Sequence, residues 1–136
     1  MELKLEVVPI PVTDVDRAKR FYSEQLGFAV DLDTQIGPDT RLVQLTPPGS
    51  GCSIHLNTGI TTPPPGSVQG LTLVVADIHD TRAELVQRGL QASNVQHFQD
   101  GAMVDGAGEG WNSFVHFNDP DGNGWQQQRL HRRLKQ

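Results

Sequence analysis

Cysteine is almost absent from this sequence: Cys52 stands alone, which excludes an internal disulfide and a thiolate-rich zinc site. No apolar run reaches the roughly 18 residues that a membrane-spanning helix requires. The N-terminal segment 1–6 contains acidic residues and no apolar run, so we expect no secretory signal there. With 136 residues, of which 36% are hydrophobic and 20% charged, the chain is predicted to be one soluble, cytoplasmic domain.

Positive charge is scarce over most of the chain. The net charge is −5, but the last eight residues, 129–136, carry four basic and no acidic side chains, so residues 1–128 carry −9. Nucleic acid is bound by basic faces, because binding releases the counterions of its phosphates. We therefore expect no nucleic-acid partner and no membrane partner, and we interpret 129–136 as a solvated basic tail.

Fourteen glycines and nine prolines divide the chain into short segments. Apolar spacing predicts two helices, which begin after the capping residues Asp14 and Asp77 and end at Gly27 and Gly89. Alternating side-chain character predicts strands near residues 4–12, 27–34, 40–47, 52–57, 69–76, 91–98, 112–118 and 123–130. The order β-α-β-β-β therefore occurs twice, with the two capping aspartates 63 residues apart.

This repeat predicts a single domain, 1–136, built from two modules. Module 1 spans about 1–60, a proline-rich connector spans 61–66, and module 2 spans about 67–130. The glycine- and aspartate-rich segment 99–110 is longer than a usual connection, and it is interpreted either as a binding loop or lid, or as the tip of a hairpin.

Three motifs resemble those of the vicinal oxygen chelate (VOC) superfamily, which includes glyoxalase I, bleomycin-resistance proteins and extradiol dioxygenases. They are Val-Thr-Asp-Val-Asp-Arg-Ala-Lys-Arg-Phe-Tyr through Leu-Gly-Phe at 12–28, Leu-Val-Val-Ala-Asp-Ile at 73–78, and Phe-Asn-Asp-Pro-Asp-Gly-Asn-Gly-Trp at 117–125. The resemblance implies an α+β fold. Each βαβββ module would curve its mixed sheet into a half-barrel, with the helices outside and a cavity between the two modules.

The same resemblance implies four positions for metal ligands on the first and last strands of each module. In this chain those positions hold Val7, His55, Leu71 and Gln126. Two apolar side chains and one amide leave His55 as the only good ligand, so we expect no metal and no cofactor at the usual site. An atypical divalent-metal site that uses His55 with His97 or His116 stays open as an alternative.

Side-chain alternation then predicts which residues line the cavity. Trp111, beside the long loop, is a candidate stacking contact, whereas Trp125 is expected to face the helix layer. The predicted ligand-binding residues share an apolar or neutral polar character, and they are Val7, Pro9, Ser53, His55, Asn57, Leu71, Leu73, Trp111, Gln126 and Gln128. Such a lining suits a weakly polar organic molecule.

Three functions are compatible with this cavity. The first is a metal-free protein that binds a small organic ligand, as the bleomycin-resistance branch does, with His55 and Gln126 orienting the ligand. The second is a lyase, isomerase or dioxygenase with an atypical metal site. The third is a metal-free enzyme with His55 as a catalytic general base. The resemblance also implies a homodimer, and it leaves open the ligand, the presence of catalysis and whether the cavity spans two chains.

Overall fold

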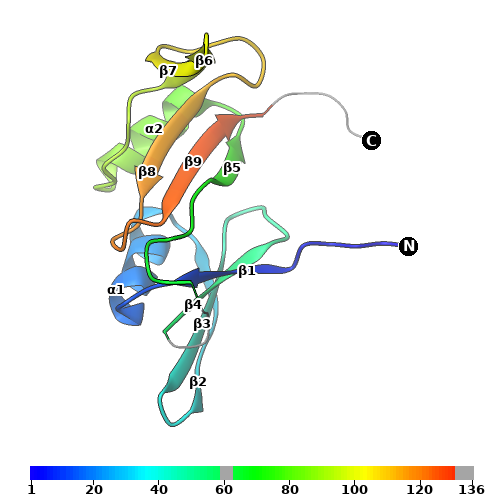
Figure 1. Ribbon diagram of the computed structural model, residues 1–136, viewed down its shortest axis with the longest axis vertical. Coiled ribbons are helices and arrows are strands. Elements are labelled where there is room, and N and C mark those ends of the chain that lie inside the picture. The colour runs from blue at the N-terminus through cyan, green and yellow to red at the C-terminus, as the bar shows by residue number, and fades with distance from the viewer. Residues whose placement is uncertain (59–62, 131–136) are drawn as a thin grey trace. The chain divides into compact units, whose positions relative to one another are not determined.

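The computed structural model describes residues 1–58 and 63–130. The chain divides into two compact units: unit 1 comprises residues 1–68 and 119–123, and unit 2 comprises residues 69–118 and 124–136. Each unit contains one mixed β-sheet (Figure 1). Positions 61 and 62 of the expected connector, and 131–136 of the expected basic tail, lie outside the described residues.

Unit 1 contains a four-stranded sheet, sheet A, with strand order β1-β4-β3-β2. β1 and β4 are parallel, and the other neighbours are antiparallel. Asp14 caps the helix, because its carboxylate accepts a hydrogen bond from Arg17 N at 3.0 Å. The elements are β1 (Val7–Pro11), α1 (Val15–Arg20), its π-helical continuation η1 (Phe21–Gln25), β2 (Ala29–Gly37), β3 (Thr40–Thr46) and β4 (Ser53–Asn57).

Unit 2 contains a five-stranded sheet, sheet B, with strand order β5-β9-β8-β6-β7. Its helix packs on one face of the sheet, where Ile78, Val95 and Val115 form a buried apolar cluster. The elements are β5 (Leu71–Val75), α2 (Ile78–Gln87), β6 (Gln96–Gln99), β7 (Ala102–Asp105), β8 (Phe114–Asn118) and β9 (Gly124–Arg129). The α+β class expected from the sequence is thus confirmed, with two helical segments among the described residues.

The segment 99–110 corrects the predicted element order, because it contains a strand of its own. β6 and β7 form a hairpin whose two turn residues, Asp100 (φ 51°) and Gly101 (φ 83°), both have positive φ. Aspartate followed by glycine favours this backbone conformation, which is the usual two-residue hairpin turn. The second half is therefore β-α-β-β-β-β, and within the segment 99–110 the irregular part begins only at residue 106.

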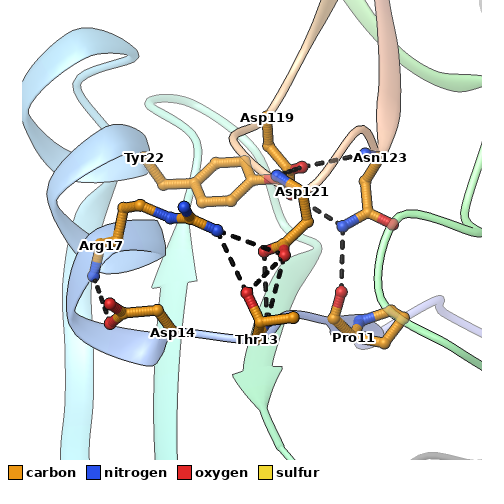
Figure 2. A network of polar contacts seen from close by, with 8 residues as sticks. All are labelled: Pro11, Thr13, Asp14, Arg17, Tyr22, Asp119, Asp121 and Asn123. Atoms are coloured by element: carbon orange, nitrogen blue, oxygen red, sulfur yellow. Dashed lines mark hydrogen bonds and ion pairs between the residues drawn. The ribbon is translucent and has the colours of Figure 1, made fainter.

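The turn between β8 and β9, residues 119–123, belongs to unit 1 although its flanking strands belong to unit 2. Asp119 is 5% exposed and accepts four hydrogen bonds. The Tyr22 hydroxyl donates at 2.8 Å, and Asp121 N, Asn123 N and Asn123 Nδ2 donate at 2.8–2.9 Å (Figure 2). Each oxygen of this buried carboxylate accepts two hydrogen bonds, and these bonds fix the shape of the turn.

The same turn binds the end of β1. Thr13 donates to the Asp121 carboxylate from Oγ1 at 2.7 Å, and Arg17 lies 3.3 Å from it (Figure 2). Asn123 Nδ2 donates to the carbonyl of Pro11 at 3.0 Å. The Asp-Pro-Asp-Gly-Asn motif therefore fixes the point where β1 leaves sheet A.

Candidate functional site

Sheet A has one face that the helix does not cover. The pairings Val7 with Ser53, Pro9 with His55, and Pro11 with Asn57 place these side chains on that face. The opposite face carries Ile10, Leu56 and other buried aliphatic residues. The five unit 1 residues selected from the sequence thus share one face, which we call the open face of sheet A.

His55 is half-buried on this face, and its ring is held by an amide. Its Nε2 lies 2.9 Å from Gln44 Oε1, on the neighbouring strand β3. Ser53 is bound in the same way, with its hydroxyl 2.6 Å from the hydroxyl of Thr46. No carboxylate contacts the His55 ring within the described residues, whereas the Thr46 hydroxyl also donates to the carboxylate of Asp31.

The open face of sheet A ends in a hollow of about 280 Å³. Asn57 is 2% exposed, and its Oδ1 has no hydrogen-bond partner among the described residues. The hollow is lined by the ends of β1 and β4 and by two prolines that follow them, namely Pro11, Val12, Thr13, Asn57, Thr58, Pro63 and Pro65. Because Asn57 pairs with Pro11 on one face, these two residues form adjacent parts of the wall.

Sheet B requires a correction to the predicted cavity lining. Leu71 pairs with Trp125 and Leu73 pairs with Gln127, which places both leucines on the face that packs against α2. Gln126 and Gln128 point to the other face, the open face of sheet B. Neighbouring residues on parallel strands share a face, so the residues beside these glutamines are Thr72 and Val74.

Aromatic rings form a row on and beside the open face of sheet B. The Trp111 and Phe114 ring centroids are 6.1 Å apart, and those of Phe114 and His116 are 6.3 Å apart with nearly parallel planes. Phe114 pairs with Gln128 and His116 pairs with Gln126 on β9. Trp111 is 47% exposed, so this row presents an accessible indole beside two amide side chains.

The loop that carries Trp111 is fixed by hydrogen bonds that the sequence did not reveal. Arg129 Nε donates to the carbonyl of Gly110 at 2.7 Å, and Asn112 bonds both the N–H and the carbonyl of Phe98. His97 lies 2.8 Å from the carbonyl of Gly106, and this contact raises the pKa of its imidazole. A side chain that bonds loop carbonyls leaves no periodic signal in a sequence, which is why Arg129 and Asn112 could not be selected and why His97 was considered only as a metal ligand.

The donor set at the family's metal positions does not fit a divalent metal. His55 is the only imidazole there, Val7 has no lone pair, Leu71 is apolar and faces α2, and Gln126 donates its amide to Thr72 Oγ1 at 3.0 Å. Within the ranges that the structure describes, no three histidine, cysteine or acidic side chains gather as a metal site would require. Both ring nitrogens of His97 already have hydrogen-bond partners, the carbonyl of Gly106 and Oε1 of Gln99.

Comparison with known families identifies the chain. The model of the Glyoxalase/Bleomycin resistance protein/Dioxygenase superfamily matches residues 4–126. The protein belongs to this superfamily. Among curated proteins, the uncharacterized protein YetH of Bacillus subtilis (strain 168) is 23% identical over 120 residues, which cover 88% of this chain and 92% of YetH.

Solved structures of superfamily members are also similar. TnmS3, described as an antibiotic binding protein from Streptomyces sp. CB03234, is 29% identical, with a TM-score of 0.76 and coverage of 95% of this chain and 97% of TnmS3. A glyoxalase/bleomycin resistance protein from the same strain is 32% identical, with a TM-score of 0.71 and coverage of 92% and 99%. Among the described residues, no helix has the length and apolar character needed to cross a bilayer.

Proposed function

We propose that this protein binds a small organic molecule through neutral side chains on the open faces of its sheets, without a divalent metal. The observation that carries the proposal is the ring row Trp111–Phe114–His116, which lies beside Gln126 and Gln128. An exposed indole offers a stacking surface, and stacked aromatic pairs contribute about 0.5–1.5 kcal/mol beyond their buried area. The neighbouring amides can orient a ligand, because each offers a donor and an acceptor.

The ligand class that these groups favour is an uncharged or weakly cationic molecule that contains an aromatic ring. The described strand residues that pair on the two open faces include no lysine or arginine, although Arg129 binds the loop that carries Trp111, and residues 1–128 carry −9. The description of TnmS3 as an antibiotic binding protein supports antibiotics as the first compounds to test. Binding without chemistry would sequester such a compound.

The test is a thermal-shift screen of aromatic antibiotics against the purified protein, with and without EDTA. A ligand present at 100 times its Kd stabilises the folded state by about 2.7 kcal/mol, so a genuine ligand is expected to raise Tm by several degrees. The shift should be the same with EDTA. A shift that EDTA abolishes would support the alternative of a lyase, isomerase or dioxygenase with an atypical metal site and would overturn the metal-free proposal.

His55→Ala is the matched variant for any compound that the screen identifies. Loss of the ring that Gln44 orients is expected to weaken binding about tenfold, which corresponds to about 1.4 kcal/mol. The control is His79→Ala, because His79 is exposed on α2, which covers the face of sheet B opposite to its open face. Equal affinity of wild type and His55→Ala, measured by calorimetry, would exclude His55 from the site.

A metal-free enzyme remains the second candidate function, since Gln44 Oε1 accepts from Nε2 and leaves Nδ1 of His55 available as a base. Mass spectrometry after incubation with a screened ligand separates the two functions: an unchanged ligand supports binding alone.

We further propose that the protein is a cytoplasmic homodimer, since symmetric dimers are the commonest assemblies. Light scattering distinguishes a dimer from the 14.9 kDa monomer.

A further inference from the structure

The open face of sheet B contains a glutamine whose amide orientation is fixed by its neighbours. The Thr72 hydroxyl donates its one proton to the carbonyl of Gly70 at 3.1 Å. Toward Gln126, 3.0 Å away, the same hydroxyl can therefore only accept, so the Gln126 amide must present its nitrogen to β5. The carbonyl oxygen of this amide, Oε1, points away from Thr72, and no described residue donates to it.

His116 lies directly opposite Gln126 on the neighbouring strand. The two residues pair in the antiparallel ladder of β8 and β9, which run side by side in unit 2 (Figure 1). Because Arg129 N donates to the carbonyl of Ser113, alternation along the ladder makes His116 and Gln126 a pair without mutual backbone hydrogen bonds. In such pairs the Cα atoms are about 4.5 Å apart and the side chains are closest. The imidazole and the Gln126 amide therefore lie next to each other.

The polar atoms of these two side chains are accessible. The hydrogen bonds of His116 to described residues are made by its backbone, with Ser93, so its ring nitrogens have no partner there. In the described part of the chain, the enclosed side-chain polar atoms without a partner are Asn57 Oδ1 and Gln127 Oε1. The His116 nitrogens and Gln126 Oε1 are not among them, so solvent and ligand atoms can reach these groups.

Together these groups form a hydrogen-bonding edge beside aromatic surface. Gln126 Oε1 can only accept, whereas a neutral imidazole offers one N–H donor and one acceptor nitrogen. A ligand matches both when it presents an N–H next to a C=O, as the amide edge of a heteroaromatic ring does. The ring of His116 stacks on Phe114, and Trp111 continues the row, so a planar ring finds stacking surface next to this edge.

We propose that His116 and Gln126 form a subsite for a planar heteroaromatic ring with an adjacent N–H and C=O, the chemistry of 2-pyridones and pyrimidinones. The ligand N–H donates to Gln126 Oε1, and the ligand C=O accepts from the imidazole N–H. The inference rests on the proposed function, because it names a ligand class for the open face of sheet B. An aromatic antibiotic that binds wild type and His116→Phe equally would leave the proposed function standing and would remove this subsite.

The experiment compares 2-pyridone, which carries the N–H beside its carbonyl, with N-methyl-2-pyridone, in which a methyl group replaces that hydrogen. Binding to the full-length protein is followed by ¹H–¹⁵N NMR, with the Gln126 side-chain amide signals assigned from their absence in Gln126→Leu. We expect 2-pyridone to shift these signals with a millimolar Kd and N-methyl-2-pyridone to bind at least about tenfold more weakly. Equal binding of both probes, or no shift with either, would overturn the proposal.

Two variants test the separate roles of the imidazole and the amide. His116→Phe keeps a ring beside Phe114 but removes the N–H, so both probes, which share the carbonyl, are expected to bind about tenfold more weakly. Thr72→Val removes the exposed hydroxyl that orients Gln126, so the preference for 2-pyridone over its N-methyl form is expected to shrink toward unity. Unchanged affinities in the first variant, or an unchanged preference in the second, would contradict these roles. Should a variant not fold, the wild-type comparison of the two probes still decides the proposal.

Discussion

Asp119 illustrates how one residue can determine the shape of a whole segment. Its carboxylate is buried, yet all four groups that point at it are donors, from Tyr22, Asp121 and Asn123. Burial of a carboxylate is costly unless such donors surround it. The tyrosine hydroxyl is the contact that comes from η1, so it connects the turn to the helix.

Tyr22→Phe is expected to lower the free energy of unfolding by about 2 kcal/mol. The variant preserves the ring but removes one donor to a buried charge, and such hydrogen bonds contribute about 1.5–3 kcal/mol. Urea unfolding followed by circular dichroism measures the difference. Ser67→Ala removes a hydroxyl from an exposed position and serves as the control, with an expected change below about 0.5 kcal/mol. Equal stabilities of the two variants would contradict the assigned role of the Tyr22 hydroxyl.

Gly66 and Gly70 form a matched pair for a second prediction. Both have nearly the same φ, 85° and 84°, but a Cβ at Gly66 would lie 2.3 Å from the carbonyl oxygen of Asp121, whereas at Gly70 nothing lies within 4 Å. Gly70→Ala therefore costs only backbone strain, about 1–2 kcal/mol. Gly66→Ala is expected to cost at least about 2 kcal/mol more because the backbone of the turn must move. Similar Tm values for both variants would show that the close approach is absent in solution.

At the scale of elements, an ion-pair cluster joins α1 to the β2–β3 hairpin. Asp33 lies 2.7 Å from both Lys19 Nζ and an Arg41 guanidinium nitrogen, and Arg41 also bonds Asp16 at 2.6 Å. Hydrogen bonds from Arg41 and then from Lys19 hold the pKa of Asp33 far below its usual value. The group is close to solvent, so the cluster contributes only about 1 kcal/mol.

The sign of this pKa shift predicts a loss of stability in acid. Because the folded-state pKa of Asp33 is lowered, its stabilising contribution is complete above the unfolded-state pKa, about 3.9, and is lost as the pH falls below that value. Asp33→Asn is expected to destabilise the protein at pH 7 and to differ less from wild type at pH 3. Urea titrations at both pH values measure the two differences. A difference that does not shrink at pH 3 would exclude the carboxylate as its cause.

Sequence periodicity predicted most helices and strands, but it predicted their boundaries and internal geometry less well. Asp14 and Asp77 marked both helix starts, because an N-cap is a local event that adjacent residues decide. β7 was missed, although Asp100 and Gly101 are a strong hairpin signal, because the many nearby glycines suggested an irregular loop. The π-helical turn of η1 has no sequence signature of this kind.

The candidate site shows how reliably the alternation of side chains along a strand predicts which face of a sheet they occupy. On sheet A, the five selected residues of β1 and β4 share one face, since these strands pair without a bulge, whereas Pro11 and Gln44 on that face were not selected. On sheet B, the positions on β5 were counted back from the family motif at Asp77, and this count selected Leu71 and Leu73. The strand pairing shows that Thr72 and Val74 are the residues beside Gln126 and Gln128. An error of one residue places a side chain on the opposite face of a sheet. The orphaned oxygen of Asn57 could not be predicted at all, because satisfaction of a polar atom depends on the three-dimensional neighbours.

At the scale of the whole molecule, unit 1 is not a continuous segment of the chain, because residues 119–123 complete it. A fragment that ends at residue 68 lacks the partners of Tyr22, Thr13 and the Pro11 carbonyl. We expect fragment 1–68 to be unfolded by circular dichroism and to show poorly dispersed NMR signals. A cooperative thermal transition in this fragment would show that the turn is dispensable.

This discontinuity also has a consequence for the time course of biosynthesis. About 55 residues separate position 68 from the end of the turn, and ribosomes add roughly 5–20 residues per second. Residues 1–68 therefore spend about 3–11 s in a nascent chain in which the Tyr22 hydroxyl and the Pro11 carbonyl have not yet met their partners. During that interval unit 1 is incomplete, and the Asp-Pro-Asp-Gly-Asn turn is the last segment that completes it.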